Sequence, residues 1–288
     1  PMGLRLEGTV DAGALRVALE GIVARHAVLR TVIEAAEGLP VGRVLPVDAF
    51  GPVLEEVDLC DSGEGAESEA LSLLEAFGRR PFDLSRDLRL RCLLVRVSGT
   101  ESLLGLVADH GSFDGSSVSV LLDELSALYA AALSGREADL PALAWSFADW
   151  ASWQRGWLEA GALEGALGYW EAHLRGAPQV LDLPMDRDRA PDRRRRSGHV
   201  AVGLDAELRA SLERVALAHG TTLYAVLLAG FGLVLSFLSR QDEVVIGSPS
   251  AGRVQAESGG LIGFFVNTLA LRLSPGAAVD LGSYLSQT

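Results

Sequence analysis

Two apolar segments, residues 89–97 and 102–108, constrain the fold of this chain more than any other feature. They are rich in Leu and Val and are separated by a short turn at Ser98-Gly99, which predicts a β-hairpin of buried strands. The run Asp-His-Gly-Ser-Phe-Asp-Gly follows over residues 109–115, and apolar residues then recur at helical spacing to about Leu133. A tight loop between a strand and a helix exposes polar side chains and free backbone N–H groups. Residues 109–115 are therefore the candidate functional segment.

The remainder of the chain alternates between strand and helix patterns. Strands are expected at 3–7, 31–33, 41–46, 199–204, 244–247 and 264–273, and helices at 11–29, 64–79, 147–174, 206–219 and 223–238. This alternation around two apolar centres predicts an α/β protein of two lobes, residues 1–183 and residues 184–288. The charged, proline-containing stretch Pro184–Gly198, which includes Arg193–Arg196, is interpreted as an exposed linker.

Charge and composition exclude several classes of function. The formal net charge of −13 argues against general nucleic-acid binding, because that binding depends on Lys and Arg neutralising phosphates. The two cysteines are too few for a disulfide framework. No stretch of about 18 uninterrupted apolar residues predicts a membrane span, and the N-terminus lacks the apolar core of a signal peptide. We therefore expect a cytoplasmic protein.

His110 is the residue in the candidate segment that is best suited to chemistry. A neutral imidazole accepts a proton near pH 7, so it suits base catalysis or the orientation of an amine. Asp109 precedes it and points to the opposite face if the strand continues, whereas Asp114 could reach back to fix the loop or bind an arginine. Taken alone, this run fits a solvated turn with a capping Asp better than it fits a site. A metal site is not expected, because no second His or Cys lies at a ligand spacing.

Seven further sequence blocks accompany this run. They are Arg25–Thr31, Pro81–Leu84, Phe147–Gln154, Tyr169-Trp170, Leu183–Arg187, Gly247–Arg253 and Ile262–Leu269. The first resembles an Arg-His-x-x-Leu-Arg-Thr block, the second a Pro-Phe-Asp-Leu block, and the central run a His-His-x-x-x-Asp-Gly motif. In this order, over nearly the whole chain, the eight blocks resemble the condensation domains of nonribosomal peptide synthetases.

The resemblance implies both a fold and a reaction. The fold would be that of chloramphenicol acetyltransferase, with two similar α/β lobes forming a V around a tunnel. The reaction would be an acyl transfer that forms an amide bond, in which the amine of a downstream aminoacyl thioester attacks an upstream acyl or peptidyl thioester. Both substrates would arrive on phosphopantetheine arms of peptidyl carrier domains beside an adenylation domain, with no intrinsic cofactor. Such domains act in the biosynthesis of antibiotics and other secondary metabolites.

The resemblance also assigns roles to individual residues. His110 corresponds to the second motif histidine, the one usually assigned to catalysis, and Gly115 lies at the helix start, where N–H groups could stabilise an oxyanion. Asp114 would be a mainly structural acid, with Arg253 from the other lobe as its ion-pair partner. The candidates for tunnel or substrate contacts are Ser112, Ser117 and Asn267.

The sequence departs from the family pattern at three points. Asp109 stands where the family has its first, structural histidine, and a carboxylate close to His110 would favour the protonated imidazole and weaken a general base. Asp109, Asp114 and Ser117 also satisfy the Asp-x-x-x-x-Asp-x-x-Ser pattern of the related heterocyclisation domains. The chain is expected to be incomplete at both ends by the standard of the family, lacking the usual first helix and roughly the last third.

Three alternatives to amide condensation follow from these departures. A non-catalytic module of the same fold would recruit a partner enzyme or gate a carrier domain, with Asp109 marking lost activity. Heterocyclisation is a lesser alternative, because the blocks flanking the central run resemble ordinary condensation domains. Epimerisation is another, and proton exchange at the α-carbon of one loaded carrier would reveal it.

Overall fold

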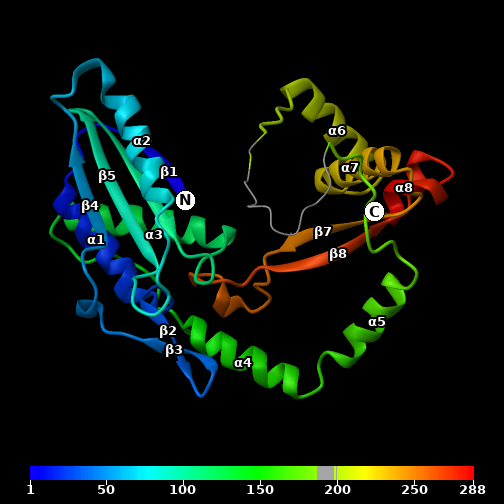
Figure 1. The fold of residues 1–288 in the computed structure, drawn as a ribbon, viewed down its shortest axis with the longest axis horizontal. Coiled ribbons are helices and arrows are strands. Elements are labelled where there is room, and N and C mark those ends of the chain that lie inside the picture. The colour runs from blue at the N-terminus through cyan, green and yellow to red at the C-terminus, as the bar shows by residue number, and fades with distance from the viewer. Residues whose placement is uncertain (187–197, 199) are drawn as a thin grey trace. The chain divides into compact units, whose positions relative to one another are not determined.

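The computed structural model describes residues 1–186, 198 and 200–288 (Figure 1). They form two compact units, one of residues 1–160 and 251–267 and the other of residues 161–250 and 268–288. Strands alternate with helices along the chain, so the predicted mixed α/β class is confirmed.

The division between the units differs from the expected boundary at residues 183 and 184. Helix α5 (Glu164–Leu174) belongs to the second unit, because Arg272 donates hydrogen bonds to the carbonyls of His173 (2.9 Å) and Arg175 (3.1 Å). The segment 251–267 returns to the first unit, where Ile262 is buried in the core. The expected linker arginines, Arg193–Arg196, lie outside the described residues.

A four-stranded sheet forms the centre of the first unit. Its strands are β1 (Met2–Glu7), β4 (Leu54–Asp58), β5 (Leu90–Ser98) and β6 (Glu101–Ala108), in the order β1-β6-β5-β4. The β5–β6 hairpin is the one that the sequence predicts, and β6 also pairs antiparallel with β1. Strand β4 pairs parallel with β5, since the chain crosses over between them through helix α2.

Three helices cover this sheet, namely α1 (Ala12–Arg25), α2 (Ala66–Gly78) and α3 (Gly115–Leu133). Successive side chains of a strand point to opposite faces, and β5 is apolar on both. Leu90, Cys92 and Leu94 pack in the core with α1 and α3, whereas Leu93 and Val95 pack with α2. The buried hairpin therefore lies in the middle of three layers, and its C-terminal end delivers the chain to residue 109.

Helix α1 is shorter than the sequence predicts. It ends at Arg25 because His26 is extended, and a 3₁₀ turn over Ala27–Arg30 follows. The hairpin of β2 (Thr31–Ala36) and β3 (Leu39–Val44) comes next. Glu37 and Gly38 between these strands have φ angles of 51° and 79°, as a tight two-residue hairpin turn requires.

The tryptophan-rich region, expected to be helical over 147–174, consists of two helices. Helix α4 (Phe147–Glu159) begins at a capping box formed by Ser146 and Asp149. The chain breaks at Gly161, whose φ of 85° is readily available only to glycine, before α5 begins. The buried side chain of Trp150 on α4 packs against the ring of Phe265 at 4.6 Å between centroids.

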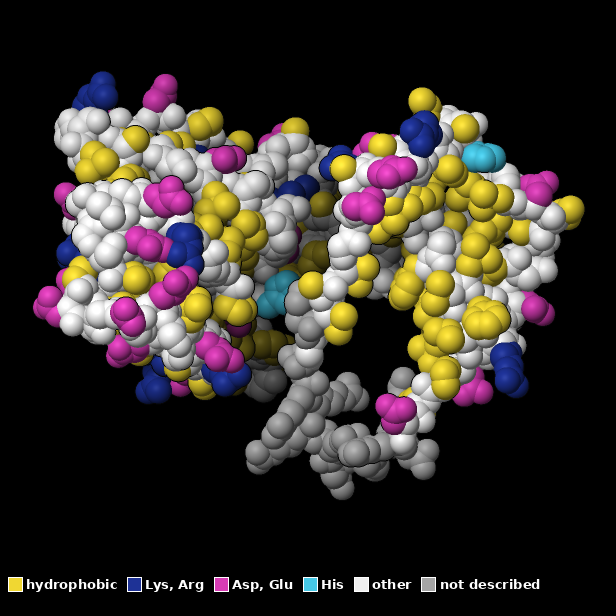
Figure 2. All heavy atoms as spheres, turned by 90° about the horizontal axis from the view of Figure 1, so that it is seen from above, with side chains coloured by type: hydrophobic (Ala, Val, Ile, Leu, Met, Phe, Trp, Pro, Cys, Tyr) yellow, Lys and Arg dark blue, Asp and Glu magenta, His cyan; other side chains and the backbone are white. Residues whose placement is uncertain are grey.

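The second unit pairs two strands with three further helices. They are β7 (Val244–Ser250), β8 (Asn267–Leu273), α6 (Ala206–Ala218), α7 (Leu223–Ser239) and α8 (Leu281–Gln287). Strand β8 begins three residues later than the predicted 264. The predicted strand at 199–204 is wrong for residues 200–204, which pair with no strand, and residue 199 lies outside the description. Figure 2 shows hydrophobic side chains gathered on this unit. Phe231, Val234 and Phe237 of α7 are exposed.

By length and composition alone, helix α3 could cross a membrane. Helices α6 and α7 pass the same test together, but the chain bends by 102° between them. In the described structure, however, Leu121 and Leu125 of α3 are buried in the core with α1 and the sheet. An apolar core helix passes the same test of composition, so α3 carries no case for a membrane span.

We predict opposite effects for the same substitution at two glycines of α7. Gly230→Ala should raise the free energy of unfolding by about 0.5–1 kcal/mol, because alanine restricts the unfolded chain and its methyl group meets open space. Gly232→Ala should lower it by roughly 1–3 kcal/mol, because the added Cβ would lie 2.6 Å from both Leu273 and the hydroxyl of Tyr284. Urea unfolding followed by circular dichroism measures both, and equal effects would contradict this packing.

Candidate active site

The candidate segment forms a tight loop between β6 and α3. The N–H of Asp109 donates to the carbonyl of Arg89 at 2.9 Å, which continues the pairing of β5 with β6 by one bond. The N–H of Ser112 then donates to the carbonyl of Asp109 at 3.0 Å and turns the chain. Helix α3 begins at Gly115, immediately after this turn. The loop is therefore held at both ends by regular structure.

His110 is exposed on this loop, and its ring is held in one orientation. Its Nδ1 lies 2.7 Å from the carbonyl oxygen of Phe113. A carbonyl only accepts, so Nδ1 carries the hydrogen and Nε2 of the neutral ring keeps a free lone pair. The ring also packs edge-on against Phe264, with 5.2 Å between centroids. The arrangement presents Nε2 as a proton acceptor.

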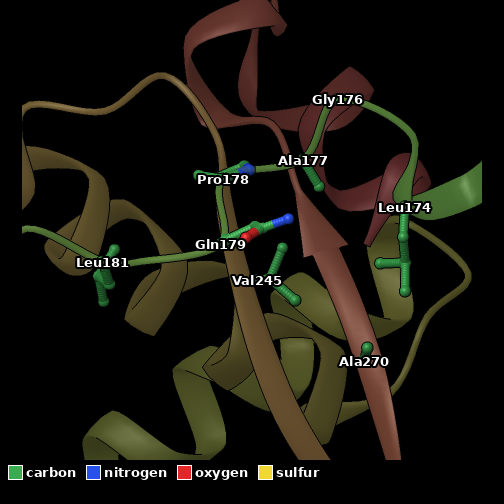
Figure 3. Close-up of a pocket in the computed structure, with 8 residues that line it drawn as sticks. All are labelled: Leu174, Gly176, Ala177, Pro178, Gln179, Leu181, Val245 and Ala270. Atoms are coloured by element: carbon green, nitrogen blue, oxygen red, sulfur yellow. The ribbon is translucent and has the colours of Figure 1, made fainter.

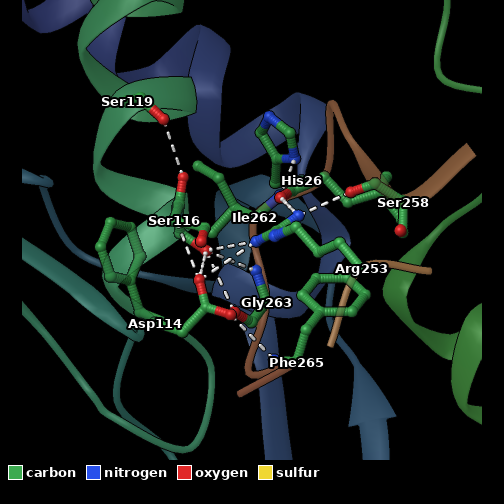
Figure 4. A network of polar contacts seen from close by, with 12 residues as sticks. His26, Asp114, Ser116, Ser119, Arg253, Ser258, Ile262, Gly263 and Phe265 are labelled. Atoms are coloured by element: carbon green, nitrogen blue, oxygen red, sulfur yellow. Dashed lines mark hydrogen bonds and ion pairs between the residues drawn. The ribbon is translucent and has the colours of Figure 1, made fainter. Parts of the chain in front are cut away.

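Asp114 is a buried carboxylate at the N-terminus of α3. Its Oδ1 accepts hydrogen bonds from the N–H of Ser117 at 2.8 Å and from Arg253 Nη2 at 3.1 Å, and its Oδ2 accepts from the N–H of Phe265 at 3.0 Å (Figure 4). Burial would raise the pKa of Asp114, but the hydrogen bonds from Ser117, Phe265 and Arg253 outweigh it and hold the pKa below its usual value. Asp114 is therefore an ionised structural anchor, with both oxygens occupied.

Arg253 connects Asp114 to the segment 251–267. Its Nη1 donates to the carbonyls of Ser258 (2.6 Å) and Leu261 (2.7 Å), and its guanidinium lies 4.1 Å from the centre of the Phe265 ring. The expected ion pair with Asp114 is thus present. The two residues lie in the same compact unit, however, and not in separate lobes as expected, because 251–267 folds with the first unit.

A second buried network, which the sequence does not reveal, anchors the same segment. The N–H of Ile262 donates to His26 Nδ1 at 3.3 Å, so His26 Nε2 carries the hydrogen and donates to Glu124 at 2.8 Å. Glu124 also accepts from Arg25 Nε at 2.8 Å. Burial would raise the pKa of Glu124, but His26 and Arg25 lower it overall. The sequence feature that could have indicated this network is Glu124, an acidic residue between Leu121 and Leu125 on the apolar face of α3.

A largely apolar cavity of about 360 Å³ opens beside His110 in the first unit. Gly115 lies on its wall, and the N–H of Gly115 has no hydrogen-bond partner among the described residues. A free N–H at a helix start attracts negative charge. The other lining residues are Pro1, Met2, Leu90, Leu106, Ala108, Phe113, Asp114, Val118 and Leu121.

The remaining predicted site residues differ in their environment. Ser117 has no exposed surface, and its hydroxyl contacts Asp114 (2.8 Å), Gly263 (3.0 Å) and Arg253 (3.0 Å), so it belongs to the anchor in this structure. Ser112 is also buried and does not line the cavity. Asn267 is exposed as the first residue of β8, and its place in a tunnel stays a prediction. Asp109 forms no hydrogen bond with His110 and instead lies 3.8 Å from Arg89.

A larger cavity of about 570 Å³ lies in the second unit, between the segment 174–181 and strands β7 and β8 (Figure 3). Its lining residues are Leu174, Gly176, Ala177, Pro178, Gln179, Leu181, Val245 and Ala270. None of these side chains is ionisable, so this cavity provides no acid or base and is a weaker candidate for chemistry than the one beside His110.

Residues 1–288 match the family model of the condensation domain, and the chain belongs to that family. It is 40% identical over 285 residues to the phosphinothricin tripeptide synthetase PhsC of Streptomyces viridochromogenes, a match that covers 99% of this chain and 26% of that protein. The X-domain in its complex with OxyB from teicoplanin biosynthesis superimposes with a TM-score of 0.84 at 28% identity over 99% of this chain and 62% of that one. The epimerization domain from the third module of tyrocidine synthetase B has a TM-score of 0.84 at 25% identity, over 99% of this chain and 64% of that one.

These matches confirm the resemblance to nonribosomal peptide synthetase condensation domains and the chloramphenicol acetyltransferase-like fold class. The chain spans about a quarter of PhsC and under two thirds of the two solved domains. Within the family, the solved domains of similar fold include an epimerization domain and a domain bound to OxyB. Members of this family therefore differ in activity, and the geometry of the site is the basis for inferring the reaction.

We predict that Asp114 makes stability depend on acid pH. A carboxyl group whose pKa is lowered by folding stabilises the folded state above its unfolded pKa, near 3.8, and loses that contribution as the pH falls through the folded value. Asp114→Asn should lower the free energy of unfolding at pH 7 by roughly 3 kcal/mol, since it leaves Arg253 unpaired. The variant should also lose less stability than the original chain between pH 5 and pH 3.

Chemical unfolding at several pH values measures both effects. Asp123→Asn is the matched control, because Asp123 is an exposed acid on the same helix. Equal acid sensitivity in the Asp114→Asn variant and the original chain would contradict the assigned role.

Proposed function

We propose that this chain catalyses amide bond formation between an acyl or peptidyl thioester on an upstream carrier domain and the amine of an aminoacyl thioester on a downstream one. The observation that carries the proposal is the state of His110, an exposed residue whose Nδ1 is fixed on the Phe113 carbonyl and whose Nε2 has no hydrogen-bond partner among the described residues. An acceptor with this orientation suits an amine that must lose a proton as it attacks.

The amine nitrogen attacks the thioester carbonyl carbon, forms the C–N bond and converts the carbonyl to an oxyanion. His110 Nε2 accepts the proton that the nitrogen loses. Collapse of the intermediate breaks the C–S bond, and the imidazolium returns the proton to the departing thiolate. The products are an amide and a free thiol on the upstream carrier.

Gly115 is the proposed donor to the oxyanion. Its N–H is free at the start of α3, and it lines the same cavity as His110. The carboxylate of Asp114 would otherwise repel a developing negative charge, but Ser117, Phe265 and Arg253 already occupy both of its oxygens. The helix start can therefore support an oxyanion beside a buried acid.

The proposal also covers the chemical character of the substrates and the domains that deliver them. The walls of the cavity beside His110 are mainly aliphatic, which supports a substrate with an apolar group next to its reacting end. Upstream and downstream carrier domains would deliver both thioesters on phosphopantetheine arms in the cytoplasm, next to an adenylation domain. Relatives such as PhsC, which are much longer than this chain, support a multidomain context.

A second candidate function is partner recruitment without catalysis. The similarity to an X-domain solved in complex with OxyB favours it, because that fold presents a binding surface to a separate protein. A reconstituted assay with both carriers loaded discriminates the two. Measurable partner binding without product under any pairing of carriers would favour recruitment, and proton exchange at the α-carbon of a single loaded carrier would instead indicate epimerisation.

We predict that His110→Ala lowers the rate of product formation by about 10²–10⁴-fold, the usual contribution of a positioned base, without lowering stability. His110 is exposed and its ring packs against Phe264 at the surface, so its removal takes no buried side chain from the core. Intact-mass spectrometry of the downstream carrier measures product, and thermal unfolding measures stability.

The matched control is His219→Ala, which removes an exposed histidine at the C-terminal cap of α6. It should leave the rate unchanged. Product formation by the His110→Ala variant at the original rate would remove His110 from the catalytic role.

We also predict that Val118→Phe changes substrate preference. Val118 lines the cavity on the first turn of α3, so a larger side chain should fill it. The kcat/KM of the variant should fall by roughly 10–200-fold for acceptors or donors with bulky apolar side chains. For alanyl substrates, kcat/KM should fall much less. Ser119→Phe, an exposed neighbour outside the cavity lining, is the control. Equal losses for large and small substrates would contradict this use of the cavity.

A further inference from the structure

Arg89 is a buried cation in an unusual position next to the candidate loop. Only 1% of its surface is exposed, at the residue before β5. Its Nε donates to the carbonyl of Thr31 at 2.9 Å and its Nη2 to the carbonyl of Leu84 at 2.7 Å. Its Nη1 is buried and makes no hydrogen bond among the described residues. The guanidinium therefore ties two segments together but still needs a counter-charge.

Asp109 is the only acidic residue that forms an ion pair with Arg89 among the described residues. Its Oδ1 lies 3.8 Å from Arg89 Nη1, and its side chain is 21% exposed. The backbones of the same two residues are joined, since the N–H of Asp109 donates to the carbonyl of Arg89 at 2.9 Å. A neutral side chain at position 109 would leave a buried charge without compensation, which is strongly unfavourable.

We propose that Arg89 and Asp109 are a matched pair of positioning residues that fixes the loop carrying His110. This inference rests on the proposed function of His110 and extends it to the residue that departs from the family motif. The carboxylate is held toward the buried guanidinium, so the imidazole keeps its bond to the Phe113 carbonyl. Asp109 is thus a counter-ion for Arg89 and takes no proton in the reaction.

A double-mutant cycle with Asp109→Asn and Arg89→Met tests the pair. Each single variant should lower kcat by about ten- to a hundredfold, with the KM for both loaded carriers unchanged, because the base is displaced while the carrier surfaces are intact. The double variant should exceed both single variants in kcat and in stability, because neither charge remains unpaired. Additive losses, or a double variant below both singles, would overturn the pairing.

Nitrogen-15 NMR of the imidazoles in the substrate-free chain provides a readout that is independent of activity. The resonances of His110 are identified by their absence in His110→Ala. Each single variant should reduce the fraction of the ring protonated at Nδ1, and the double variant should restore it. An unchanged tautomer in both single variants would overturn the positioning role even if the chain proves to be a binding module.

Arg91→Met is the matched control for the cation. Arg91 lies two residues further along, donates to the carbonyls of Arg80 (2.5 Å) and Pro81 (3.4 Å) and stacks 4.0 Å from the ring centre of Phe82. It forms no ion pair among the described residues, so its effects should add to those of Asp109→Asn. If Arg89→Met does not fold, Arg89→Gln, which also removes the charge, takes its place in the cycle, and additivity there would also overturn the proposal.

Discussion

The carboxylate of Asp114 is the interaction on which the candidate site depends. It caps α3 through the N–H of Ser117, receives the N–H of Phe265 and pairs with Arg253, so two segments distant in sequence, the start of α3 and the segment 251–267, meet at one side chain. Each donor compensates for part of the cost of burying the charge. Because the cap of α3 is formed by this residue, the free N–H of Gly115 and the loop before it are fixed by the same bonds.

Two acidic residues of the site, Asp114 and Asp109, lie in different environments and therefore have different roles. Asp114 has hydrogen bonds to both oxygens, whereas Asp109 is partly exposed and faces one buried cation without a hydrogen bond. Neither acid hydrogen-bonds to His110, whose ring is oriented by a neutral carbonyl instead. In the described part of the chain the imidazole therefore has a backbone carbonyl, and no carboxylate, as its hydrogen-bond partner.

The sequence predicted most of the first unit because local patterns determine it. The β5–β6 hairpin and α3 follow from apolar periodicity and a turn, and the pairing of Asp114 with Arg253 followed from family resemblance. The partners in the networks of Arg89 and Glu124 did not follow from local patterns, since each network links residues more than 50 positions apart or uses backbone carbonyls. The division between units was misplaced for the same reason, because the return of 251–267 to the first unit depends on tertiary contacts.

The two buried networks together explain how one exposed aromatic ring reaches His110. The N–H of Gly263 donates to the hydroxyl of Ser117 at 3.1 Å, and the N–H of Phe265 donates to Asp114 at 3.0 Å. Both neighbours of Phe264 are thus bonded to the first turn of α3 or its cap, while Ile262 is held by His26. The Phe264 side chain is left on the surface, 39% exposed, where it packs against the imidazole. The segment 251–267 therefore adds the contact with Phe264 to the bond that orients the His110 ring from its own loop, and the bonds that stabilise the fold also support the proposed base.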